Sequence, residues 1–218
     1  MSVGKTHVSN VIRRHEYDIR IARREVRNRK LKAGIPNRVW GVDLTGKTDD
    51  NGRLHPVLGV IDHGTHANLA LTALQNKTTI TLLRALLDVI EQAGKPQALR
   101  TDNEGIFTSR LFRFGLWMLG ITHQRTDPHC PWQNGRIERF FGTLKQKLDQ
   151  WTVANRDQLN ASLHVFRLWY NHIRPHQHLQ GHTPAEIWND VDISRQPPRK
   201  AIWFDAWDGL LTGYYLRR

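Results

Sequence analysis

The fold is decided by residues 39–74, which read VWGVDLTGKTDDNGRLHPVLGVIDHGTHANLALTAL. Runs of apolar and β-branched residues at 39–45, 54–62 and 68–74 predict three strands. The Asp-Asp-Asn-Gly sequence at 49–52 predicts a hairpin turn between the first two. Three strands joined in this way form an antiparallel meander.

The chain beyond the meander alternates helix and strand patterns. Apolar residues at helical spacing predict helices over 78–92, 109–119, 133–151 and 159–173. Short strands are predicted over 98–101 and 121–125. We therefore expect an α/β fold, with a mixed five-stranded sheet that carries helices on its faces.

The composition excludes several classes of protein. The 218 residues are 39% hydrophobic and include 8 Trp, as in a folded globular protein rather than a disordered chain. No apolar run reaches the roughly 18–20 residues that cross a bilayer, and no secretory signal is evident. Cys130 is the one cysteine, so the chain has neither an internal disulfide nor a cysteine-based zinc site. We expect a cytoplasmic protein with no membrane partner.

The charge predicts a polyanionic partner. Lys and Arg number 32 against 20 Asp and Glu, a formal net charge of +12. The first 38 residues hold 11 of these bases and only 3 acids. Such an excess fits nucleic acid, an anionic membrane surface or plain solubility, and of these we expect nucleic acid as the partner of this arm. Its apolar spacing predicts a basic helix over 8–32, which either packs on the main domain or ends a DNA-binding module. The arginines expected to contact DNA are Arg13, Arg14, Arg20 and Arg24.

Three carboxylates stand beside apolar neighbours, where an acid is costly. Asp43 lies within the first predicted strand, Asp102 ends the fourth, and Glu138 follows the start of the next helix. In a mixed sheet of this order the first and fourth strands can be neighbours, which would bring the three acids together. Clustered carboxylates repel unless a cation binds them, and an all-oxygen set favours Mg²⁺ or Mn²⁺. Two such ions would hold the attacking and leaving oxygens of a phosphoryl transfer.

Four stretches of the chain carry a family resemblance. They are WGVDLT at 40–45, RTDNEGIFTS at 100–109, PHCPWQNGRIERFFGTLKQKL at 128–148 and WYNHIRPHQHLQGHTPAEIW at 169–188. They resemble the catalytic core of retroviral-type integrases and, above all, the transposases of bacterial insertion sequences. The spacing agrees, because 58 residues separate Asp43 from Asp102 and 35 separate Asp102 from Glu138. Glu104 departs from the pattern, which frequently has glycine there.

The resemblance implies a ribonuclease H-like fold in which Asp43, Asp102 and Glu138 bind two Mg²⁺ or Mn²⁺ ions. It implies a DNA transposase that nicks the ends of its element and joins their 3′-hydroxyls to target DNA. It also implies a homo-oligomer on DNA in the bacterial cytoplasm, associated with the nucleoid. The resemblance covers residues 38–188, so we divide the chain into a basic arm (1–37), a catalytic core (38–190) and an aromatic tail (191–218).

The residues around the acids are candidates for DNA contact. On the predicted helix from 133, residues 134, 138 and 145 share a face, which favours a phosphate contact for Lys145 over a merely solvated position. Asn103 either faces the site or closes a turn, and Trp132 either touches DNA or caps the core. Arg174 and His176 either support the fold or contact DNA. The expected DNA-contacting set outside the arm is Asn103, His129, Trp132, Gln133, Asn134, Arg136, Arg139, Lys145, Arg174 and His176.

Two other functions remain open from sequence alone. One is a truncated, non-catalytic DNA-binding relic or regulator, because 38 residues before the core are too few for the two helix-turn-helix modules of many such transposases. A separate protein would then recognise the element ends. The other is a metal-dependent nuclease of the same fold that uses water alone.

Overall fold

The computed structural model describes residues 6–7, 15, 34–126, 134–191 and 198–217. The predicted basic helix over 8–32, with Arg13, Arg14, Arg20 and Arg24, lies outside the described residues except for His15. The compact unit that begins at Ala33 holds the predicted core and the C-terminal segment. Among the described residues, no helix combines the length and apolar character needed to cross a membrane.

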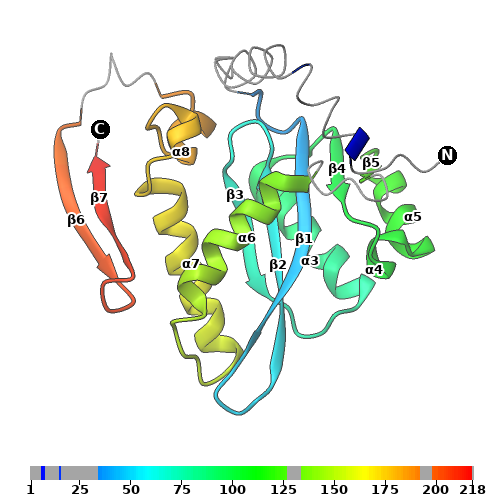
Figure 1. Ribbon diagram of the computed structural model, residues 1–218. Coiled ribbons are helices and arrows are strands. Elements are labelled where there is room, and N and C mark those ends of the chain that lie inside the picture. The colour runs from blue at the N-terminus through cyan, green and yellow to red at the C-terminus, as the bar shows by residue number, and fades with distance from the viewer. Residues whose placement is uncertain (1–5, 8–14, 16–33, 127–133, 192–197, 218) are drawn as a thin grey trace. The chain divides into compact units, whose positions relative to one another are not determined.

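A mixed five-stranded sheet forms the centre of this unit, as predicted (Figure 1). Its order is β3-β2-β1-β4-β5. The first three strands pair antiparallel, while β1 pairs with β4 and β4 with β5 in parallel. The strands are β1 (Val39–Thr48), β2 (Leu54–Asp62), β3 (Asn68–Ala73), β4 (Ala98–Thr101) and β5 (Thr122–Arg125).

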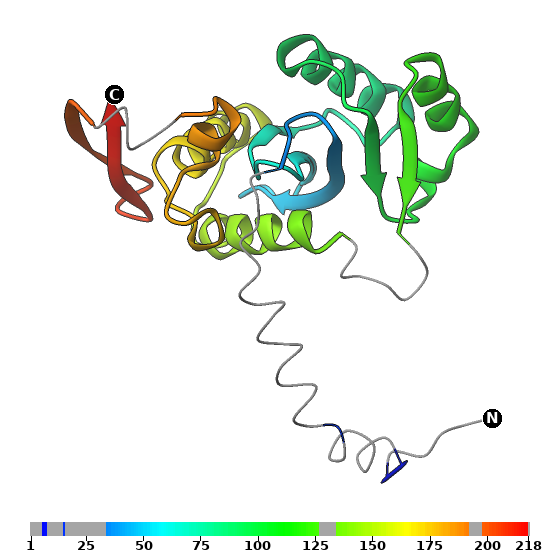
Figure 2. The ribbon, with the colours of Figure 1, turned by 90° about the horizontal axis from the view of Figure 1, so that it is seen from above.

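Helices cover both faces of the sheet (Figure 2). One face packs against α3 (Thr79–Ala93), α4 (Gly105–Thr108) and α5 (Arg110–Met118). The other packs against α6 (Gly135–Leu148) and α7 (Arg156–His172). The chain continues through a 3₁₀ turn, η2 (Gln177–Leu179), and α8 (Pro184–Trp188). The main helices were predicted to within a few residues, and α4, η2 and α8 were not.

Strand β2 explains why both faces can be covered. Its side chains alternate between two apolar cores, with Val57 and Ile61 facing α6 and α7 while Leu58 and Val60 face α3 and α5. Gly59 lies on the α6 face, where an added Cβ would stand 2.6 Å from Cζ of Phe141. A glycine here lets α6 approach the sheet closely.

The C-terminal segment forms a hairpin of β6 (Lys200–Ala206) and β7 (Leu211–Arg217). Trp207 at its turn is buried and stacks on Trp151, with ring centroids 5.5 Å apart. The indole Nε1 of Trp169 on α7 donates a hydrogen bond to the Thr212 carbonyl at 2.9 Å. The predicted aromatic tail is therefore a small β element that completes the core around α6 and α7.

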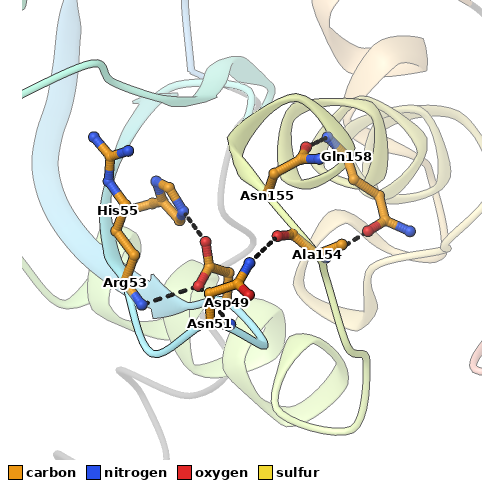
Figure 3. A network of polar contacts seen from close by, with 7 residues as sticks. All are labelled: Asp49, Asn51, Arg53, His55, Ala154, Asn155 and Gln158. Carbon is orange, nitrogen blue, oxygen red and sulfur yellow. Dashed lines mark hydrogen bonds and ion pairs between the residues drawn. The ribbon is translucent and has the colours of Figure 1, made fainter.

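The tip of the β1–β2 hairpin is fixed by a polar network (Figure 3). The buried Asp49 carboxylate accepts hydrogen bonds from the backbone amides of Asn51 and Arg53 and contacts Nε2 of His55 at 2.8 Å. The pKa of Asp49 is lowered, chiefly by the His55 contact. Asn51 in turn donates to the carbonyl of Ala154 at 3.0 Å, which joins the hairpin to the segment between α6 and α7.

Candidate active site

Asp43 lies in the middle of β1, on the sheet face that α6 covers. Its neighbours Val42 and Leu44 point to the opposite core, so strand alternation turns Asp43 toward α6. The carboxylate is partly buried and accepts a hydrogen bond from the Leu44 amide at 2.7 Å.

Asp102 directly follows β4 and is placed beside Asp43 by the strand register. In the parallel pair Gly41 lies opposite Arg100, and the same register extended by two residues sets Asp43 opposite Asp102. The Asp102 carboxylate accepts a hydrogen bond from the backbone amide of Glu104 at 2.9 Å. The meander-then-crossover order predicted this adjacency.

Glu138 is exposed in the first turn of α6. The buried side of the same helix, with Ile137, Phe140 and Phe141, holds it against the sheet. The sequence pattern thus fixes which way Glu138 can face, because the apolar stripe must be buried.

The electrostatics of the site are seen at Asp43. The pKa of Asp43 is raised from 3.8 to about 6, mainly because the carboxyl group is buried. The Leu44 hydrogen bond opposes this rise, and the negative charges of Asp102, Glu104 and Glu138 add to it. Burial and like charge both disfavour the ionised form, so this carboxylate is stabilised by any nearby cation.

The chemistry of this set fits a hard divalent cation, since all its side-chain donors are carboxylate oxygens. Among the residues that the structure describes, however, no three His, Cys, Asp or Glu side chains are grouped closely enough to hold a metal ion. The acids are near neighbours that have to come closer before all three could bind one ion.

The expected DNA-contacting residues fall into two groups. Arg136, Arg139 and Lys145 are exposed on α6, the helix that carries Glu138. Asn103, next to Asp102, is also exposed, and its side-chain amide donates to the Thr126 carbonyl at 2.7 Å. The three bases share the helix of Glu138, and Asn103 adjoins Asp102 and closes a loop as well.

Burial separates two other expected residues from this surface. Asn134 is only 3% exposed, because it caps the start of α6 instead of continuing the helical face shared by Glu138 and Lys145. His176 is 4% exposed and packs edge-on against Tyr170, with centroids 4.7 Å apart. This burial favours support of the fold for His176, one of its two expected roles, while DNA contact by Asn134 stays a prediction.

The remaining expected residues have other positions. The guanidinium of Arg174 lies over the rings of Trp169 and Tyr170, at 5.6 and 5.9 Å from their centroids. This contact favours support of the fold, one of the two roles expected for Arg174. His129, Trp132 and Gln133 lie outside the described residues.

Sequence reasoning missed two features near the site. Glu104 forms an ion pair with Lys77, a residue just before α3, and no spacing rule links the two positions. His63 is buried immediately after β2 and close to the start of α6. The one available signal was the position of His63 at the end of a predicted buried strand, where burying a polar side chain is costly.

Comparison with known proteins gives a consistent result. Two family models, each described as Integrase core domain, match residues 33–131 and 119–184. A 39.2 kDa protein of insertion element IS476 from Xanthomonas euvesicatoria is 31% identical over 162 residues, 74% of this chain and 47% of that protein. A 31.7 kDa protein of IS407 from Burkholderia multivorans is 30% identical over 155 residues, 71% of this chain and 56% of that protein. The chain therefore spans about half the length of these relatives.

Solved structures show the same fold. A chain of the simian T-cell lymphotropic virus intasome matches with a TM-score of 0.64 and 23% identity, covering 85% of this chain and 69% of that one. The HTLV-2 integrase catalytic core domain, solved with magnesium, matches with a TM-score of 0.58 and 20% identity. That match covers 72% of this chain and 99% of the viral domain, so the described unit has the ribonuclease H-like fold that the sequence predicted.

Proposed function

The chain belongs to the integrase core domain family, and from that premise we propose that it is the DNA-cutting and DNA-joining core of a bacterial insertion-sequence transposase. The family and its insertion-element relatives support DNA transposition or integration as the general process. The finer proposal is that the protein nicks element ends and joins the freed 3′-hydroxyls to target DNA.

One observation carries the proposal: Asp43 and Asp102 lie on neighbouring parallel strands, and Glu138 lies on the helix above them. The strand register and the shared effect of the acids on the pKa of Asp43 support this arrangement. An inactive relic would have no reason to keep a partly buried carboxylate that destabilises its fold.

We propose Asp43, Asp102 and Glu138 as the ligands of Mg²⁺ or Mn²⁺, with two ions as the family pattern implies. When bound, such ions activate the attacking hydroxyl or water and stabilise the leaving oxygen. The protein's own contribution is positioning. The Leu44 amide orients the Asp43 carboxylate and the Glu104 amide orients that of Asp102.

The exposed bases on α6 complete the proposal. Arg136, Arg139 and Lys145 lie on the helix that presents Glu138. Lys145, seven residues from Glu138, shares its face, so a DNA backbone bound to Lys145 would pass the acids. Asn103 borders the same place from the β4 side. We propose these four as DNA contacts, because phosphate contacts position a duplex without reading its sequence.

The assembly is proposed to be a homo-oligomer on DNA in the bacterial cytoplasm, at the nucleoid, with a possible separate protein for end recognition. Two element ends must be joined to one target, which requires more than one active site. The HTLV-2 integrase catalytic core domain has been solved in dimeric and trimeric forms, and the matching simian T-cell lymphotropic virus chain is part of an intasome.

The test is a strand-transfer assay on branched DNA that carries the repeats flanking the gene, with Mg²⁺ or Mn²⁺. Glu138→Gln should abolish the products while leaving DNA binding nearly unchanged. Glu91→Gln, which alters an exposed acid on α3, is the matched control and should join DNA normally. Joining by the Glu138 variant would overturn the assignment of the acid. Salt-sensitive binding without any product would favour the non-catalytic alternative, and cleavage without joining would favour a nuclease.

A further inference from the structure

Two buried polar atoms near the start of α6 have no use in the roles proposed so far. His63 is 7% exposed and Asn134 is 3% exposed. Neither Nε2 of His63 nor Oδ1 of Asn134 has a hydrogen-bond partner among the described residues. Buried polar atoms without partners are rare and costly, so each calls for an explanation.

The two atoms flank the same point on β1. A Cβ added to Gly41 would stand 2.5 Å from Nε2 of His63 and 3.6 Å from Oδ1 of Asn134. Only glycine leaves this space open. We refer to Gly41, His63 and Asn134 as the α6 joint.

The joint connects the elements that carry the candidate acids. Gly41 precedes Asp43 by two residues and therefore faces the same side of β1. Asn134 precedes Glu138 by one helical turn. The backbone amide of His63 donates to the Val39 carbonyl at 2.8 Å, which fixes this histidine to the start of β1.

The imidazole and the amide are chemically complementary. Burial and the nearby charges of Arg136 and Arg100 lower the pKa of His63 to about 3, so the ring is neutral at physiological pH. A neutral imidazole has one donor and one acceptor nitrogen, and a carboxamide has both an N–H donor and a C=O acceptor. Within hydrogen-bonding distance, one choice of imidazole tautomer and amide orientation would therefore pair a donor with an acceptor.

We propose that His63 and Asn134 are positioning residues, whose side chains hydrogen-bond to each other when the first turn of α6 closes on β1 and so bring Glu138 to Asp43 and Asp102. The inference rests on the proposed function of the three acids. Two independent observations motivate it: Nε2 of His63 and Oδ1 of Asn134 lack partners, and the described acids are not yet grouped as metal ligands. Closure of the first turn of α6 on β1 would give the two polar atoms a partner and would bring the three acids closer together.

The test combines a double-mutant cycle with amide hydrogen exchange, a readout that does not depend on strand-transfer activity. His63→Leu and Asn134→Leu remove the polar atoms and keep most of the volume. We expect each to slow strand transfer at saturating DNA by about tenfold or more, since small misplacements are costly, with unchanged DNA affinity. The double variant should be no slower than either single variant. Amide hydrogen exchange of residues 138–141, whose amides bond to carbonyls of the first turn of α6, should slow when Mg²⁺ and DNA are added to the wild type and should not respond in the three variants.

His55→Leu is the matched control, because His55 is a buried histidine at the far end of β2 that contacts Asp49. It should lower stability without changing the rate of strand transfer or the response of exchange in residues 138–141 to Mg²⁺ and DNA. His63→Gln keeps a donor and an acceptor and should restore most of the rate. If the leucine variants fail to fold, the His63→Gln variant still tests whether His63 acts as a positioning residue.

Independent, multiplying effects of the two leucine substitutions would overturn the joint, as would a wild-type exchange response to Mg²⁺ and DNA in the leucine variants, or an inactive His63→Gln variant. If the wild-type protein joins no DNA, the proposed function fails, and the exchange data still test whether His63 and Asn134 act as a pair.

Discussion

Replacing Asp43 with Asn should raise the stability of the metal-free protein and abolish metal-dependent strand transfer. Asn has nearly the same shape as Asp, and its side-chain oxygen can still accept the hydrogen bond from the Leu44 amide. The substitution removes the charge that burial and the neighbouring acids disfavour. Stability and function should therefore change in opposite directions at this position.

The size of the effect follows from the raised pKa. An acid with a pKa of about 6 in the folded chain and 3.8 in the unfolded chain lowers the free energy of unfolding by up to about 3 kcal/mol at pH 7.5. Asp43 is only partly buried, so we expect a gain of about 1–2 kcal/mol for the variant after solvent screening. In a unit of this size that corresponds to about 3–6 °C in Tm.

The raised pKa of Asp43 also sets the direction in which stability changes with pH. The native state holds its proton more tightly than the unfolded state, so the wild type should lose stability as the pH rises from about 4 to about 6. The Asn variant should lack this loss. Urea unfolding followed by the fluorescence of the buried Trp40 and Trp169, in EDTA, measures both proteins from pH 4.5 to 7.5. Asp205→Asn, at an exposed position on β6, is the control.

Metal adds a second readout to the same experiment. Mg²⁺ or Mn²⁺ should raise the Tm of the wild type above pH 6 and have little effect on the variant, because a ligand stabilises only the state that binds it. A variant that is less stable than the wild type at pH 7.5, or a difference that is the same at pH 4.5 and pH 7.5, would refute the reasoning.

Three further outcomes are expected. Gly59→Ala should destabilise the fold by about 1–3 kcal/mol, because its Cβ would overlap Phe141, and a thermal melt that shows no loss would contradict the close packing of α6. Trp207→Ala should cost about 3–5 kcal/mol in urea unfolding, whereas Trp203→Ala, on the exposed side of the hairpin, should change stability by no more than about 0.5 kcal/mol; equal losses would argue against the hairpin as part of the core. Lys145→Ala should weaken metal-free DNA binding and reduce the slope of log affinity against log salt by about 1, and an unchanged slope would remove Lys145 from the DNA surface.

The sheet could be predicted from sequence because its signals are local. The turn residues at 49–52 and the apolar runs around them fix the β1–β2 pair, and the family motifs point to Asp43, Asp102 and Glu138. The adjacency of Asp43 and Asp102 follows from strand order alone, so it was also within reach.

Positions outside regular periodicity were predicted less well. Asn134 was assigned to the exposed face of the helix, but it precedes the first helical residue, where the 3.6-residue repeat does not apply. The contact between His63 and Gly41 joins strand ends that are distant in sequence. Such contacts depend on how closely two strands and a helix approach, which no single-sequence pattern reports.

The C-terminal hairpin also sets the order in which the two sides of the domain can fold during synthesis. On the face that carries α3 and α5, nearly all core residues precede Thr122 in the chain. The face that carries α6 and Glu138 waits for Trp207 and Leu211, which emerge from the ribosome many residues later. The two sides of the sheet therefore complete their packing at different times, and the side that presents Glu138 is the last to be fully packed.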